Sequence, residues 1–292
     1  MNEVLLTLNS PLRPEFEAAG KKVLEGKTVA VLTLAGGVGS RLGFSGPKGS
    51  FSLETPEGKK SLFEMQARKT QGLLWVILVS PKTREKTIEH LQQKILSCTD
   101  QEPIYLIEQQ EIEALGKDRE TLFLNGSPVL MPNGNGAVFE ALRAPSACIV
   151  KKEAVEMTGQ SMLEVFRAQG IKYLNIISID NVLVQVADPI ALGLLEKEAV
   201  EIVSAGIRKR KGCSMGVFLS KQGNSATICE YTDKPTGEIV SIQGTPICNI
   251  ANHLLSVDFL KRIDPKKLQY HEVYKKIQHD KEPEPAAPNA IK

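Results

Sequence analysis

Residues 34–50 read LAGGVGSRLGFSGPKGS and place six glycines in seventeen positions, directly after an apolar, β-branched run at 28–35. Such a run predicts a buried strand, and Gly36 ends it. Glycine lets backbone amides approach a ligand closely, and a loop of free amides that leaves a strand is suited to an anion. Because Arg41 and Lys48 add two positive charges, the segment predicts a phosphate-binding loop.

Other interpretations of this loop are open to test. It could be a solvent-exposed turn with incidental cations, because glycine-rich loops without function are common. A P-loop requires G-x-x-x-x-G-K-[ST], whereas Lys48 is followed by Gly49. The dinucleotide-binding pattern G-x-G-x-x-G begins at Gly37 but ends on Leu42. The loop therefore matches neither pattern.

The rest of the chain first alternates strands and helices and then changes character. Ser61 and Glu64 form a capping box for a helix that runs to about Thr70, and Asp188 followed by Pro189 begins another helix. Further helices are predicted at about 83–96 and 162–169, and buried strands at 73–79, 104–107 and 173–179. Beyond about residue 200, short strands follow one another without helices.

This order predicts an α/β fold with a doubly wound, mostly parallel sheet and an antiparallel β-rich section. In such sheets ligands bind at the carboxyl ends of the strands. The glycine loop and Asp180 both follow predicted strands, so we expect both to lie at that edge.

Composition narrows the class of protein. With 292 residues and 42% hydrophobic content the chain can bury a substantial core. Its net charge of +2 argues against a nucleic-acid binder. Five dispersed cysteines without a C-x-x-C pair argue against a zinc site, and no apolar run approaches the roughly 20 residues that a membrane span needs. We expect a cytoplasmic protein that binds neither nucleic acid nor membranes.

The glycine-loop pattern L-A-G-G-x-G-[ST]-R-L-G-x(n)-P-K-G resembles the signature of eukaryotic UDP-sugar pyrophosphorylases, specifically the UDP-N-acetylglucosamine pyrophosphorylase type. Gln109 in IEQQ is similar to the uracil-binding glutamine of that family, although Gln110 and Glu113 replace its usual glycine and proline. Further blocks that resemble the family follow in order: PNGNGAVFEAL (132–142), IDNVLVQVADP (179–189), CEYTD (229–233), NIANH (249–253), YHEVYKKI (270–277) and PNAIK (288–292).

The resemblance implies a Rossmann-like nucleotidyltransferase fold of the GT-A type. It places a catalytic domain at residues 28–292 behind a short N-terminal helical segment at 1–27. Residues 143–161 look like an insertion relative to the family. We expect the chain to lack the small C-terminal domain that the family carries after its I-K motif.

The resemblance also implies a reaction, in which UTP and N-acetylglucosamine 1-phosphate give UDP-N-acetylglucosamine and pyrophosphate by in-line attack on the α-phosphate. Positioning and charge neutralisation dominate such a transfer, and no covalent nucleophile is needed. Arg41, Lys48 and Lys292 are the implied catalytic cations. Asp180 is the implied ligand of Mg²⁺, which prefers oxygen ligands.

The implied binding residues fall into two sets. The nucleotide-binding set is Leu34, Ala35, Gly36, Gly37, Gln109 and Gly134. The sugar-binding set is Asn135, Glu230 and Asn249. His253, in the NIANH block, is interpreted as a structural hydrogen bonder, because the phosphate nucleophile needs no general base.

Two alternatives stay open at this stage. The same chemistry could use glucose 1-phosphate or galactose 1-phosphate, because the sequence does not show the pocket that admits the acetamido group. The chain could also be a non-catalytic module that binds UDP-sugars. In either case the expected partners are small molecules, and we expect a monomer.

Overall fold

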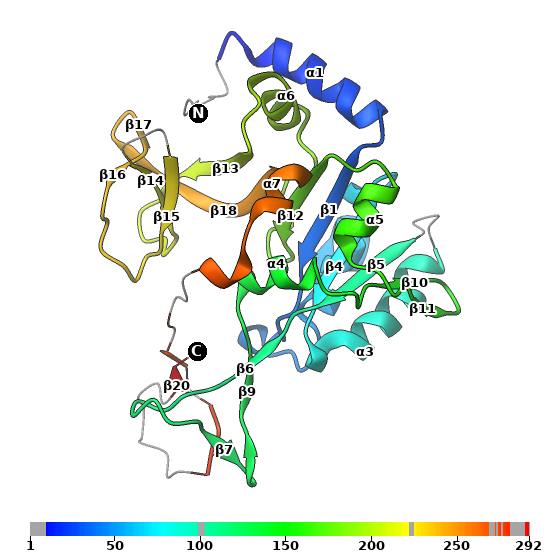
Figure 1. Cartoon of the computed structure of the whole chain (residues 1–292), viewed down its shortest axis with the longest axis vertical. Helices are drawn as coiled ribbons and strands as arrows, with labels where there is room; N and C mark the ends of the chain where they lie inside the picture. The colour runs from blue at the N-terminus through cyan, green and yellow to red at the C-terminus, as the bar shows by residue number, and fades with distance from the viewer. Residues whose placement is uncertain are drawn as a thin grey trace. The chain divides into compact units, whose positions relative to one another are not determined.

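The computed structural model describes residues 10–98, 103–221, 225–268, 272, 274–275, 277–280 and 290–291 (Figure 1). The chain forms two compact units. The first unit comprises Met1–Thr33, Met65–Trp75 and Phe166–Lys261, and the second comprises Leu34–Glu64, Val76–Val165 and Arg262–Lys292. Within the described residues, no helix combines the length and the apolar sequence that a membrane crossing requires.

Strands of the first unit follow the order β1-β12-β18-β14-β15. Their bounds are β1 Val29–Leu34, β12 Tyr173–Ser178, β18 Thr245–Ser256, β14 Val217–Lys221 and β15 Ser225–Cys229. Strand β13 (Ile202–Arg208) and the short β17 (Ser241–Ile242) pair with β18, and β16 (Glu238–Ile239) pairs with β14. The pairs of β18 with β12, β13, β14 and β17 are all antiparallel, which confirms the β-rich section.

Strands of the second unit follow the order β11-β10-β5-β4. Their bounds are β4 Leu74–Val79, β5 Ile104–Glu108, β10 Cys148–Val150 and β11 Val155–Met157. Along the chain, helix α2 (Leu62–Thr70) connects β1 to β4, and helix α3 (Pro81–Leu91) connects β4 to β5. Connections that contain a helix are those that parallel strands need. The predicted α/β fold class is therefore confirmed.

Local sequence signals fix several element boundaries. The Ser61 amide donates to Glu64 Oε2 at 2.8 Å, and the Glu64 amide donates to Ser61 Oγ at 3.1 Å, which confirms the capping box. Helix α5 (Met162–Ala168) ends before Gly170, whose φ of 68° only glycine adopts readily. Segment 143–161 contains the antiparallel hairpin of β10 and β11, and β10 pairs with β5.

The remaining elements are short. A π-helical turn (Gln92–Leu96) extends α3, and four more helical elements are α4 Val138–Ala141, α7 Val257–Arg262 and the 3₁₀ turns Asn135–Ala137 and Pro265–Lys267. The paired short strands are β2 Ser52–Thr55 with β3 Gly58–Ser61, β6 Glu111–Glu113 with β9 Leu130–Pro132, β7 Phe123–Leu124 with β8 Ser127–Pro128, and β19 Tyr274–Lys275 with β20 Ala290–Ile291.

Helix α1 (Arg13–Glu25) lies alongside α6 (Pro189–Glu198), as Figure 1 shows. Their backbones meet at two glycines. A Cβ on Gly20 would lie 1.7 Å from the carbonyl oxygen of Pro189, and one on Gly193 would lie 1.8 Å from that of Phe16. As predicted, Asp188 caps α6, and its side chain accepts from the Ile190 amide at 2.8 Å.

We expect Gly193→Ala to destabilise the protein, because its added methyl group meets backbone, which cannot rotate away. Overpacking of this kind typically costs about 1–3 kcal/mol in the free energy of unfolding. Urea unfolding followed by circular dichroism measures it. The matched control is Gly26→Ala, where the nearest atom to the new Cβ is 3.4 Å away. Equal midpoints for the two variants would contradict the close helix packing.

Candidate nucleotide and sugar site

The glycine loop begins where β1 ends and folds back on itself. The Ala35 amide still donates to Leu78 O at 2.9 Å, so the chain leaves the sheet only after that residue. The loop then closes through two backbone bonds, from the Gly39 amide to Gly46 O at 3.0 Å and from the Lys48 amide to Gly37 O at 3.0 Å. These bonds fix the backbone of the loop without a ligand.

Three successive amides at the start of this loop stay open. Within the described part of the chain, the N–H groups of Gly36, Gly37 and Val38 donate to no acceptor. Gly36 is half-buried, whereas Gly37 and Val38 are exposed. A backbone donor needs an acceptor, and since none of the described residues provides one, solvent or a ligand can. The arrangement is one that suits an anion, and anion binding by this loop stays a prediction.

Gln109 lies directly against Gly36. It follows β5, its amide donates to Val79 O at 2.9 Å, and its side chain is only 6% exposed. A Cβ on Gly36 would lie 2.3 Å from Gln109 Nε2 and 2.8 Å from Cδ, so this contact requires glycine. The side-chain amide of Gln109 makes no hydrogen bond to the described residues, and it offers both a donor and an acceptor.

The two loop cations lie in short 3₁₀ turns. Arg41 is in the turn Ser40–Leu42, and its side chain lies outside the described part of the structure. Lys48 begins the turn Lys48–Ser50 and is half-buried. Behind it, Gly49 packs so tightly that a Cβ would lie 2.2 Å from the ring of Phe63. Close packing therefore holds the backbone from which the Lys48 side chain extends. Lys292 lies outside the described residues.

Gly134 and Asn135 lie in the loop that follows β9. The amide of Asn133 donates to Gln110 O at 3.1 Å, which brings this loop next to the neighbour of Gln109. Gly134 adopts φ 84° and ψ 179°, a conformation that is nearly specific to glycine. Asn135 is exposed. In the second unit, this backbone hydrogen bond therefore links the Gly134 loop to the residue that follows Gln109, the predicted uracil contact.

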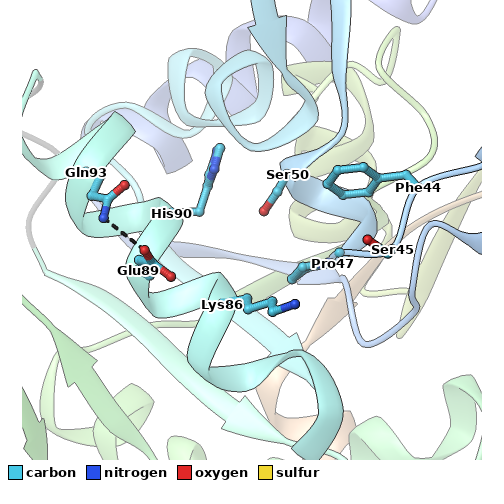
Figure 2. Close-up of a pocket in the computed structure, with 9 residues that line it drawn as sticks. Phe44, Ser45, Pro47, Ser50, Lys86, Glu89, His90 and Gln93 are labelled. Atoms are coloured by element: carbon cyan, nitrogen blue, oxygen red, sulfur yellow. Dashed lines mark hydrogen bonds between the residues drawn. The ribbon is translucent and has the colours of Figure 1, made fainter.

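The sequence did not predict the cavity between the glycine loop and helix α3. The volume of this cavity is about 350 Å³. Loop residues Phe44 and Pro47 face the helix across it (Figure 2). The other labelled residues are Ser45, Ser50, Lys86, Glu89, His90 and Gln93. His90 Nε2 lies 2.8 Å from Ser61 Oγ, and burial lowers the pKa of His90. A neutral imidazole thus connects α3 to the capping box of α2.

In the first unit, Asp180 lies two residues beyond β12 and is exposed. Its amide lies 3.4 Å from Ser178 Oγ. Nowhere in the described residues do three or more potential metal-binding side chains gather. One exposed carboxylate at a strand end fits Mg²⁺, which often keeps several waters and takes its other ligands from substrate phosphates.

Glu230 and Asn249 approach the same glycine in the first unit. The Asn249 amide donates to Gly216 O at 2.9 Å, and a Cβ on Gly216 would lie 3.4 Å from Glu230 Oε1. Asn249 Oδ1 accepts from the Ala251 amide at 2.9 Å, which orients the side chain. An acceptor and an amide in this arrangement can bind sugar hydroxyls.

His253, from the same block as Asn249, is a structural hydrogen bonder, as predicted. Its Nδ1 lies 2.8 Å from Ser204 Oγ. Burial lowers the pKa of His253, which favours the neutral ring. This histidine therefore joins β18 to β13.

One family of known proteins matches nearly the whole chain. The family model described as UTP–glucose-1-phosphate uridylyltransferase matches residues 7–286, nearly the whole chain. The chain belongs to this family. The predicted membership in the UDP-sugar pyrophosphorylase family is thus confirmed.

Curated relatives within this family carry a more specific name. UDP-N-acetylglucosamine pyrophosphorylase of Saccharomyces cerevisiae is 29% identical over 314 residues, covering 97% of this chain and 62% of the relative. UDP-N-acetylglucosamine diphosphorylase 2 of Arabidopsis thaliana is 29% identical over 290 residues, covering 88% and 54%. The chain thus spans less than two thirds of the length of these relatives.

Solved structures agree with the fold. The Trypanosoma brucei uridine diphosphate N-acetylglucosamine pyrophosphorylase, crystallised with an inhibitor, matches with a TM-score of 0.76 and 29% identity, covering 95% of this chain and 56% of that one. The UDP-glucose pyrophosphorylase of Leishmania major in complex with UDP-glucose matches with a TM-score of 0.63 at 17% identity, covering 91% and 57%. The second likeness shows the fold alone.

Proposed function

We propose that the chain is a uridylyltransferase that converts UTP and N-acetylglucosamine 1-phosphate into UDP-N-acetylglucosamine and pyrophosphate. Relatives with that name cover most of the chain. The observation that carries the proposal is the contact between Gly36 and Gln109. It sets a side chain able to pair with uracil against a loop with three open amides.

The second unit contributes the groups that bind the nucleotide. Gln109 pairs with the uracil edge, while the open amides of Gly36 and Gly37 bind phosphate oxygens. Leu34 and Ala35 fix the start of the loop, and Gly134 borders the nucleotide through the link between Asn133 and Gln110. Each interaction replaces water on a polar group that has no partner among the described residues.

The proposed chemistry is an in-line transfer. A phosphate oxygen of the sugar 1-phosphate attacks the α-phosphorus of UTP while the bond to the pyrophosphate oxygen breaks. Lys48, together with Arg41 and Lys292, neutralises the phosphate charge and the departing pyrophosphate. When bound, Mg²⁺ supplies charge neutralisation at the phosphate oxygens. Asp180 is the residue that would hold the ion.

The first unit contributes the groups for the sugar. Glu230 accepts hydrogen bonds from sugar hydroxyls, and the Nδ2 group of Asn249 donates to them. Asn135 stays a predicted sugar contact. We infer that the protein acts as a monomer in the cytoplasm on these small molecules. The dispersed cysteines support the cytoplasmic location.

A second candidate function uses glucose 1-phosphate, because the family model that matches the chain is described by that sugar. Pyrophosphate release from UTP with N-acetylglucosamine, glucose and galactose 1-phosphates separates the candidates. We expect kcat/KM to favour N-acetylglucosamine 1-phosphate by about 10–200-fold, the range for one substituent in a pocket. Preference for glucose 1-phosphate would contradict the proposal. Tight UDP-sugar binding by calorimetry without any pyrophosphate release would indicate a binding module instead.

A further inference from the structure

The backbone around Asp180 is held from helix α2. Gln66 Nε2 donates to Ser178 O at 3.1 Å, just before the aspartate. Lys69 Nζ donates to two carbonyl oxygens just after it, that of Val182 at 2.5 Å and that of Val184 at 3.0 Å. Gln66 and Lys69 are three residues apart and therefore share one face of the helix.

The Gln66 side chain is itself fixed. Its Oε1 accepts from Thr33 Oγ1 at 2.9 Å, and Thr33 Oγ1 accepts from Trp75 Nε1 at 2.9 Å. All three side chains are fully buried. A buried network in which every member is satisfied is rigid, so the carbonyl of Ser178 is held in one place.

The segment that follows Asp180 is held at its far end, near Gln185 and Ala187, by two buried asparagines. Asn252 Nδ2 donates to Gln185 O at 3.2 Å, and Asn175 Oδ1 accepts from the Ala187 amide at 2.8 Å. Asn175 Nδ2 in turn donates to Asn252 Oδ1 at 2.7 Å. Residues 179–187, here called the aspartate loop, are thus fixed at both ends, and Lys69 holds the middle.

We propose that Lys69 is a positioning residue for the Asp180 carboxylate. The inference rests on the proposed function, in which Asp180 binds a divalent cation together with the phosphates. Asp180 is exposed, and its carboxylate extends from the backbone that Gln66 and Lys69 hold. One ammonium that binds two loop carbonyls restricts that backbone without touching the ion. Loss of residues that orient a ligand typically lowers metal affinity by roughly 10–100-fold.

The test measures Mn²⁺ binding to the whole chain by electron paramagnetic resonance, with UTP present. We expect Lys69→Met, which keeps the aliphatic stem and removes the donors, to weaken Mn²⁺ binding about tenfold. Lys69→Arg, which keeps charge and donors, should recover most of the affinity. Lys172→Met, at an exposed lysine just before β12, is the matched control and should bind Mn²⁺ normally. UTP affinity without metal should stay constant in all variants.

A local readout accompanies the binding measurement. The amides of Asn181 and Val184 donate within the loop, to Ser178 O at 3.3 Å and to Asn181 O at 3.2 Å. Hydrogen exchange at both should be faster in Lys69→Met than in the control. Asp180→Asn separates the two claims. If it weakens Mn²⁺ binding and Lys69→Met does not, Lys69 is only structural and this inference fails alone. If Asp180→Asn binds Mn²⁺ normally, the proposed metal ligand is wrong and the inference falls with it.

Discussion

Lys48→Ala is expected to lower kcat for pyrophosphate release by about 10²–10³, the usual cost of removing one group that stabilises transition-state charge. Lys48 extends from a backbone fixed by the bond to Gly37 O and by the packing of Gly49 on Phe63. A cation on a fixed backbone lowers the reorganisation that the reaction needs. Steady-state rates at saturating UTP measure the effect.

Lys59→Ala is the matched control for this experiment. Lys59 is an exposed lysine in β3 of the same unit, so the substitution makes the same change in net charge. We expect its kcat to stay within about twofold of the wild type, because exposed charges contribute little. A Lys48→Ala enzyme with normal kcat would show that the loop cation does not stabilise the transfer.

Gly36→Ala is expected to weaken UTP binding by about 10–100-fold. The new Cβ would lie 2.3 Å from Gln109 Nε2, and Gln109 is too buried to move aside without losing its place beside the loop. A polar contact to uracil would then be lost or left unpaired, which costs about 1–3 kcal/mol. Calorimetric titration with UTP measures the change.

A glycine outside the loop provides the control. The nearest atom to a Cβ on Gly26 is 3.4 Å away, so Gly26→Ala should bind UTP nearly as well as the wild type. A double-mutant cycle tests whether Gly36→Ala weakens UTP binding through Gln109. In a Gln109→Ala background, Gly36→Ala should cost little more, because the clashing side chain is gone. Additive losses would mean that Gly36 acts through the loop backbone and not through Gln109.

Local signals explain what could be predicted of the fold. The capping box of Ser61 and Glu64 and the Asp188 cap depend on residues within one helical turn, so the sequence displays them directly. Buried strands such as β12 also show as apolar runs. The predicted elements therefore agree closely with those observed.

Strand β18 was not predicted, although at 12 residues it is long and pairs with several neighbours. Asn249, Asn252 and His253 interrupt its apolar alternation. The structure gives each a partner: Ala251, Asn175 and Ser204 respectively. These partners come mostly from distant strands, so a local pattern cannot reveal that the polar residues belong to a strand.

The candidate site likewise combines residues that the sequence predicted with contacts that it did not. Gly36, Gln109 and Asp180 were predicted because their motifs resemble the family, yet the contact between Gly36 and Gln109 joins separate strand ends. Lys69 gave no signal at all. It donates to backbone carbonyls 113 and 115 residues further along the chain, and any residue type can supply a carbonyl. Side chains that act on distant backbone escape motif reasoning for this reason.

The central claim is that the amides of Gly36 and Gly37 bind the phosphates of a uridine nucleotide. Titrating ¹⁵N-glycine-labelled protein with UTP and following the glycine amide resonances tests it most directly. The account predicts large shifts for Gly36 and Gly37, and little change for Gly72 and Gly170, which adopt positive φ at helix ends. UTP binding that leaves the Gly36 and Gly37 resonances in place would contradict the account.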